Sequence, residues 1–229
     1  PQTVTVTGVD DNLIDGTISS TITVAVNDGS SDNNFDPVAN QTVTATTTDD
    51  DVAGFTIVES GGSTSVAESG TTDTVTIVLD TQPASDVVLA ITSSDTGEAT
   101  VTSTLTFTNG NWNTAQTVTV TGVDDLAVDG NQSSTITVSV NDAASDDGYD
   151  SVADQTFTVT TSDDDTAGFT ITQTGGSTTV GESGTTDTFT IVLNTQPSSN
   201  VVVTFGSSDS GEVAVTSSVT FTNGNWNTA

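Results

Sequence analysis

The chain contains one long internal repeat, and this feature limits its possible folds more than any other. The segment Gln2–Asp11 (QTVTVTGVDD) returns unchanged at Gln116–Asp125, 114 residues later. The segment FTNGNWNTA ends at Ala115 and again at Ala229, which is the same spacing. Self-similarity at a fixed period is typical of repeat architectures, in which each period forms one structural unit. The 229 residues therefore contain two periods of one domain type.

Within each period, apolar residues alternate with Thr and other polar residues. Val75, Ile77 and Leu79, for example, alternate with Thr74, Thr76 and Val78. Such alternation predicts half-buried β-strands, and clusters of Gly, Asn, Asp and Ser separate the segments. We therefore predict an all-β protein made of tandem immunoglobulin-like β-sandwich repeats of 114 residues, with about seven strands each. The strands expected in one unit lie at 55–57, 75–79, 87–91, 105–107, 118–120, 136–140 and 157–159.

The triple-Asp clusters Asp49–Asp51 and Asp163–Asp165 are the predicted boundaries between units. Three adjacent carboxylates are too costly to bury in a core. The boundaries predict the C-terminal half of a repeat at 1–50, a complete repeat at 51–164 and the N-terminal half of the next repeat at 165–229. An isolated half would leave unpaired sheet edges, which natural proteins avoid. The sequence is then an excerpt of a longer tandem array, or subunits complete each other's halves in a polymer; both alternatives predict a fibre.

The charge of the chain excludes several classes of function. It has 31 Asp and Glu residues, no Lys, Arg, His or Cys, and a net charge of −31. Nucleic-acid binding needs basic residues, so we expect no nucleic-acid partner. No apolar run approaches the ~18 residues of a membrane helix, so we expect no membrane insertion. Without His, Lys or Cys, only paired-carboxylate glycosidase chemistry remains, and no cleft can be inferred; we predict that the chain is not an enzyme.

The carboxylates gather in the predicted loops. Two of them ~4 Å apart repel by about 1 kcal/mol in bulk water and by several times more near a protein surface. Since the chain has no basic residue, only cations from solution can relieve this repulsion. Oxygen ligands without nitrogen or sulfur select Ca²⁺ or Mg²⁺, and flexible acidic loops favour Ca²⁺. The alternative is a solvated acidic surface that keeps the protein soluble.

Three segments together resemble the Calx-beta domain: Val66–Leu79 (VAESGTTDTVTIVL), Leu105–Asp125, and the strand that ends in Asp163–Asp165. The whole chain is most similar to the tandem Calx-beta-like repeats of very large bacterial surface adhesins. The resemblance implies a calcium site at one end of the sandwich, with acids from four places. In the complete unit these ligands are Glu68, Asp95, Asp124, Asp125, Asp129, Asp163, Asp164 and Asp165. In the incomplete units they are Asp10, Asp11, Asp15, Asp49, Asp50, Asp51, Glu182 and Asp209.

The loop DDLAVDG has fewer acids than the sodium–calcium exchanger version of the domain. This difference favours weak binding of extracellular grade, on the order of 10⁻⁴–10⁻³ M. We therefore expect a structural repeat of a calcium-stabilised extracellular or cell-surface fibre, filament or adhesin stalk. Its partners would be copies of itself, as neighbouring repeats or as subunits.

A binding module for a polysaccharide or a cell-surface ligand is the alternative function. Trp112 and Trp226 lie in identical NGNWNTA segments and could stack on sugars, or could cover one end of the core. Because the two segments are identical, they favour a scaffold role over the recognition of a specific ligand. Ice binding through rows such as Thr3, Thr5 and Thr7 is disfavoured, because the twist of a sandwich sheet breaks a flat hydroxyl array.

Overall fold

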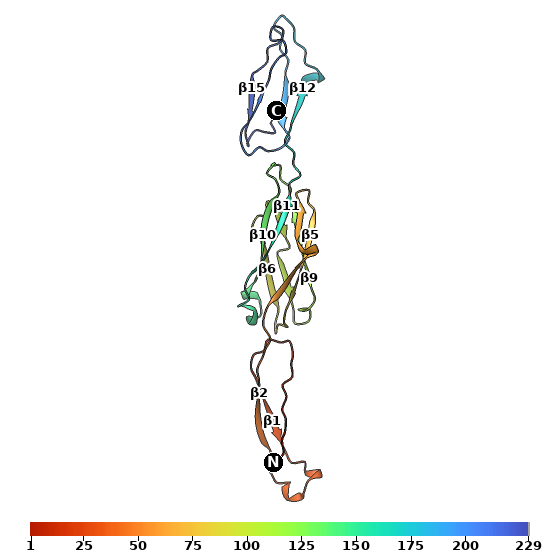
Figure 1. The fold of residues 1–229 in the computed structure, drawn as a ribbon, viewed down its shortest axis with the longest axis vertical. Coiled ribbons are helices and arrows are strands. Elements are labelled where there is room, and N and C mark those ends of the chain that lie inside the picture. Colours follow the sequence, from red (N-terminus) through yellow and green to blue (C-terminus); the bar gives the residue numbers. More distant parts are fainter. Residues whose placement is uncertain (229) are drawn as a thin grey trace.

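The computed structural model describes residues 1–228. It shows three parts that follow one another along a single long axis, with the chain ends far apart (Figure 1). Within these residues the only helices are 3-10 turns of three residues, and none is long and apolar enough to cross a membrane. The prediction of an all-β protein is confirmed.

The strands are β1 Ile18–Val24, β2 Gln41–Thr47, β3 Phe55–Glu59, β4 Thr64–Ala67, β5 Thr72–Leu79, β6 Val87–Ser93, β7 Ala99–Val101, β8 Thr104–Phe107, β9 Gln116–Gly122, β10 Gln132–Val140, β11 Gln155–Ser162, β12 Phe169–Gln173, β13 Phe189–Leu193, β14 Val201–Thr204 and β15 Ser218–Phe221. The 3-10 turns are η1 Asp28–Ser30, η2 Asn33–Phe35, η3 Ser60–Gly62, η4 Asp142–Ala144, η5 Asp147–Tyr149 and η6 Thr174–Gly176.

The middle part is a sandwich of two sheets. One sheet has the order β3-β5-β9-β7 and the other has the order β4-β11-β10-β6-β8. All pairs are antiparallel except β4 with β11. The sandwich contains the seven predicted strands and two more, β4 and β7. These two strands have four and three residues, which is too short for an alternating pattern to stand out in the sequence.

The core lies between the two sheets and consists of the alternating apolar residues. Fully buried members include Val75, Ile77, Leu89, Phe107 and Val118. Trp112 packs against this core, and its carbonyl accepts a hydrogen bond of 3.1 Å from the N–H of Leu79. The Trp112 side chain is therefore half-buried against the core and does not stand free of it.

The middle repeat has a first half, residues 51–115, and a second half, residues 116–164. The strands of these two halves are interleaved in the sandwich. Strand β9 belongs to the second half but lies between β5 and β7 of the first half. The hairpin β10–β11, also from the second half, lies between β4 and β6 of the first. Each sheet is therefore complete only when both halves are present. The exact boundaries at residues 50/51 and 164/165 stay a prediction.

In the described residues of the two outer parts, each strand pairs with a strand of the same half-repeat. Residues 1–50 contain the hairpin β1–β2, and residues 165–228 contain the pairs β12–β13 and β14–β15. The segments equivalent to β9, β4 and β7 lie at 2–8, 178–181 and 213–215, and in the described structure none of them is a strand. They lack the neighbours that the other half supplies in the middle sandwich.

Neighbouring parts touch through the same contact at both joints. The N–H of Gln82 donates to the carbonyl of Asn12 over 2.7 Å, and that of Gln196 donates to the carbonyl of Leu126 over 2.6 Å. A short parallel bridge accompanies each bond, between Leu13 and Gln82 and between Ala127 and Gln196. The loop after the double Asp thus docks on the following unit in the same way twice.

Gly122 provides a test of how tightly β4 packs on β9. A side-chain carbon at this position would overlap the carbonyl oxygen of Ala67, although the backbone of Gly122 does not need a positive φ. We expect Gly122→Ala to lower the free energy of unfolding of the middle sandwich by about 1–3 kcal/mol, because the methyl group forces the strands apart. Chemical denaturation of the full chain measures the change.

The matched control is Gly29→Ala, since Ala143 already occupies the equivalent position of the next period. The added carbon would meet only Oδ1 of Asn27, at 3.8 Å. If both variants unfold at the same denaturant concentration, β4 and β9 do not approach each other as closely as described.

Candidate metal centre

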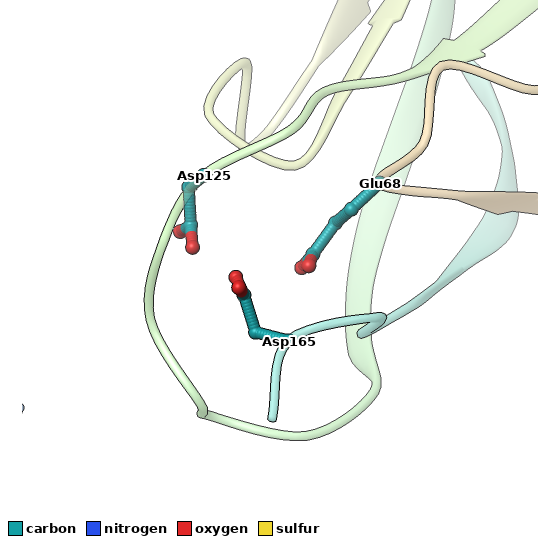
Figure 2. Close-up of side chains that lie close together, drawn as sticks. All are labelled: Glu68, Asp125 and Asp165. Carbon is teal, nitrogen blue, oxygen red and sulfur yellow. The ribbon is translucent and has the colours of Figure 1, made fainter. Parts of the chain in front are cut away.

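Three acidic side chains from separate segments meet at one end of the middle sandwich. Glu68 follows β4, Asp125 lies in the loop after β9, and Asp165 follows β11. One oxygen atom of each lies within 4.8 Å of the other two. Figure 2 shows the three carboxylates directed toward a common space. A second group of Glu98, Asp125 and Asp129 meets the same criterion and shares Asp125.

Glu68 is the most unusual member of this site. Strand β4, which pairs in parallel with β11, leads directly into Glu68. The backbone N–H of Glu68 donates a hydrogen bond of 3.1 Å to the carbonyl of Ser162. Its side chain is fully buried, and neither carboxylate oxygen has a hydrogen-bond partner among the described residues. Burial, together with the charges of Asp125 and Asp163, raises the pKa of Glu68 to about 7. An unpaired buried carboxylate is costly, so the position requires a proton or a cation.

Two further carboxylates also have a buried oxygen without a hydrogen-bond partner. One oxygen of Asp165 and one of Glu98 are buried without a hydrogen-bond partner in the described structure. Burial raises the pKa of both groups, and neighbouring charges raise it further, first Asp163 for Asp165 and first Asp129 for Glu98. The site therefore concentrates negative charge that no group of the chain neutralises.

Asp163 differs from its neighbours because its oxygens are already occupied. One accepts a hydrogen bond of 2.7 Å from the N–H of Gly130, and the other accepts one of 2.8 Å from the N–H of Asp165. These bonds hold the pKa of Asp163 below its usual range. Asp163 thus fixes the loop that carries Asp129 and orients Asp165.

The same arrangement recurs in the first part of the chain. Asp49 accepts from the N–H groups of Gly16 and Asp51, over 2.7 and 2.9 Å. The first Asp of each triple cluster is therefore a loop-positioning residue. A sequence signal for this role exists, since an Asp-Gly turn stands at Asp15–Gly16 and again at Asp129–Gly130.

Among the predicted ligands of the complete unit, the structure gathers Glu68, Asp125, Asp129 and Asp165. The two groups do not include Asp95, Asp124, Asp163 or Asp164. Asp95 accepts a 2.9 Å bond from the N–H of Gly97, which shapes its own turn, and Asp124 and Asp164 are exposed. All of these residues remain predictions as metal ligands.

Glu98 is a member of the site that the sequence-based ligand set omitted. The sequence predicted Asp95 as the metal ligand from this loop. The structure instead brings Glu98 close to Asp125 and Asp129. A signal was present, because Glu212 occupies the same position in the next period. No spacing rule separated Glu98 from Asp95 as the inward-facing acid.

The donor set fits a calcium ion. Calcium takes carboxylate and carbonyl oxygens at 2.3–2.6 Å, so two oxygens on one ion are separated by up to about 5 Å. The observed limit of 4.8 Å among Glu68, Asp125 and Asp165 falls within that range. The unpartnered oxygen atoms of Glu68 and Asp165 are the ones available to it. The incomplete units carry equivalents of only part of this set, with Asp11 and Asp51 on one side and Glu182 on the other.

No protein-family model and no curated protein matches the chain. Among solved structures, the apo-form Calx CBD1 domain is 16% identical, with a TM-score of 0.36 over 48% of this chain and 98% of that one. SSP-19, an MSP-domain-like protein of Caenorhabditis elegans, is 19% identical, with a TM-score of 0.30 over 44% and 92%. Domains 4 and 5 of the S-layer protein SbsC are 19% identical, with a TM-score of 0.34 over 63% and 58%. At these scores the functional argument depends on the residues alone.

The raised pKa of Glu68 predicts how the metal-free protein responds to pH. Between its ordinary value of 4.5 and about 7, the folded state holds a proton on Glu68 that the unfolded state releases. The free energy of unfolding therefore falls as pH rises through this interval. Asp165 and Glu98 act in the same direction. Asp163 acts in the opposite direction, but only below its ordinary value of 3.8.

Denaturation of the full chain in chelator, at a series of pH values, measures this slope. Glu68→Gln should flatten it, because the amide does not titrate. Glu182→Gln, which changes the exposed equivalent, should leave it unchanged. A slope that survives Glu68→Gln in full would show that other groups cause it.

Proposed function

We propose that the chain is a structural unit of a calcium-stabilised extracellular fibre, filament or adhesin stalk. The observation that carries this proposal is Glu68, a buried carboxylate without a hydrogen-bond partner, facing Asp125 and Asp165. In a chain with no Lys, Arg or His, a cation from solution is the available counter-charge. When a cation binds only the folded arrangement, its binding free energy adds to folding.

The position of the site supports a mechanical role. Asp165 stands four residues before β12, where the chain leaves the middle sandwich for the next unit. Asp125 is adjacent to Leu126, whose carbonyl accepts the hydrogen bond from Gln196 of that unit. A cation between Asp125 and Asp165 would tie the docking loop to the linker. The joint would then resist bending.

An extracellular location agrees with the expected affinity. Binding on the order of 10⁻⁴–10⁻³ M is useful where calcium is millimolar. The partners in such a fibre are copies of the same unit, each in contact with its neighbours. The packing of Trp112 on the core leaves no specific observation in favour of a carbohydrate-binding module.

Thermal unfolding of the full chain tests the proposal. For a dissociation constant on the order of 10⁻⁴ M, 10 mM Ca²⁺ stabilises the folded state by about 2.7 kcal/mol. That amount raises the unfolding midpoint of a unit of this size by about 10 °C or more relative to chelator. Glu68→Gln should abolish the rise, and it should raise the midpoint in chelator at pH 8, since it removes a buried charge.

Asp154→Asn serves as the control, because its carboxylate is exposed and outside both acidic groups. Equal midpoints with calcium and with chelator would contradict the proposal. A calcium response that persists in Glu68→Gln would place the ion elsewhere.

A further inference from the structure

The docking loop that follows each double Asp, residues 12–15 and 126–129, contacts the next unit along the chain. In the first part its backbone makes the hydrogen bond and the parallel bridge to Gln82. One of its side chains takes part as well, because Ile14 is half-buried and packs against the core of the middle sandwich. An apolar residue of one unit therefore contributes to the packing of the next.

Ile14 lies against the 3-10 turn η5 of the middle sandwich. A carbon added to Gly148 of this turn would lie 3.5 Å from Cγ2 of Ile14. The next residue, Tyr149, is fully buried, and its hydroxyl donates to the carbonyl of Thr81, directly before Gln82. The docking loop thus contacts two segments that Tyr149 joins inside the sandwich.

The first part holds its docking loop in place through the linker. One carboxylate oxygen of Asp49 accepts hydrogen bonds from the N–H groups of Asp15 and Gly16, over 3.0 and 2.7 Å. The other accepts one of 2.9 Å from the N–H of Asp51. Gly16 has a φ of 69°, which a glycine adopts without steric cost. Because these bonds already restrict the loop, its docking costs little further conformational entropy.

The second docking loop repeats the pattern. It makes the same backbone contact with the following unit, through Leu126 and Gln196. Its residue Val128 is equivalent to Ile14, so both loops place a β-branched apolar residue directly before the Asp-Gly turn. An apolar side chain in an acidic loop adds to stability where a neighbour removes it from water.

We propose that the docking loop of each unit is a folding element of the unit that follows, so that a sandwich gains stability from the preceding unit without any cation. The partner of the loop is the next unit of the same chain, and the contact combines an apolar side chain with a backbone hydrogen bond. In tandem arrays, stability is approximately the sum of the intrinsic stabilities of the units and of the interfaces between neighbours. The docking loop supplies such an interface.

Thermal unfolding of the full chain in chelator, followed by tryptophan fluorescence, tests the proposal. Trp226→Phe leaves Trp112 as the only tryptophan, and Trp112 packs on the core of the middle sandwich. In this background, Ile14→Ala should lower the midpoint of the Trp112 transition by about 3–6 °C, because the truncation removes contacts with that core. Ile14→Val should retain most of the midpoint, since Val128 occupies the equivalent position.

Ile18→Ala is the matched control, because it makes the same change in the same part of the chain. Ile18 is 44% exposed, and the next period has Gln132 at its position. The control should leave the Trp112 midpoint unchanged. A midpoint that does not change in Ile14→Ala, or that falls equally in Ile18→Ala, would overturn the proposal.

Asp49 provides a second test, since it holds the docking loop from outside the middle sandwich. Asp49→Asn removes one of the two acceptor oxygens and should lower the Trp112 midpoint in chelator. Asp50→Asn makes the same change of charge at the adjacent, exposed residue and should not lower it. Equal midpoints for these two variants would contradict the proposal that the loop held by Asp49 stabilises the following unit.

Calcium separates this inference from the proposed function. If Ile14→Ala lowers the midpoint in chelator and Ca²⁺ raises it in the unchanged chain, both stand. If Ile14→Ala lowers the midpoint but Ca²⁺ has no effect, the docking stands and the proposed function fails. If Ca²⁺ raises the midpoint and Ile14→Ala has no effect in chelator, the proposed function stands and the inference on the docking loop is wrong.

Discussion

The interleaving of the two halves of each repeat is the constraint on which the rest of the structure depends. Because β9 lies between β5 and β7, neither half can complete a sheet without the other. The same arrangement buries the apolar faces of both halves in one core. It also explains why the equivalent segments at 2–8, 178–181 and 213–215 are not strands in the described structure, although their sequences nearly repeat those of β9, β4 and β7. Strand formation here is decided by the neighbour as much as by the sequence.

The interleaving also creates the charged site. The parallel pairing of β4 with β11 brings Glu68 beside the chain that continues into Asp165, while β9 leads to Asp125. A buried carboxylate usually obtains a basic partner, but this chain has none to offer. Under the proposed function, the stability and the geometry of the joint are linked to the cations in the surrounding solution.

Much of the fold could be predicted from the residues alone. The alternation of Val75, Ile77 and Leu79 with polar residues identified a strand with one buried face, and the 114-residue spacing identified the unit. The short strands β4 and β7 were not predicted, because three or four residues carry no periodic signal. In the site, the resemblance to the Calx-beta domain implied Glu68 and Asp165 as ligands; the structure brings their carboxylates together, and their role as ligands stays a prediction. The positioning role of Asp163 and the inward direction of Glu98 could not be foreseen, since both depend on loop geometry.

The sequence by itself determined the β-sandwich class, the repeat and the lack of any basic side chain to neutralise the carboxylates, because these follow from periodicity and from the count of charged groups. The tertiary structure alone decided which carboxylates converge, which are occupied by backbone N–H groups, and which strands of one half require the other. Those outcomes depend on pairings between residues as far apart as Thr64 and Val159. Local sequence patterns carry no information on contacts at that separation, because a pattern records which face of a strand is buried and not what covers it.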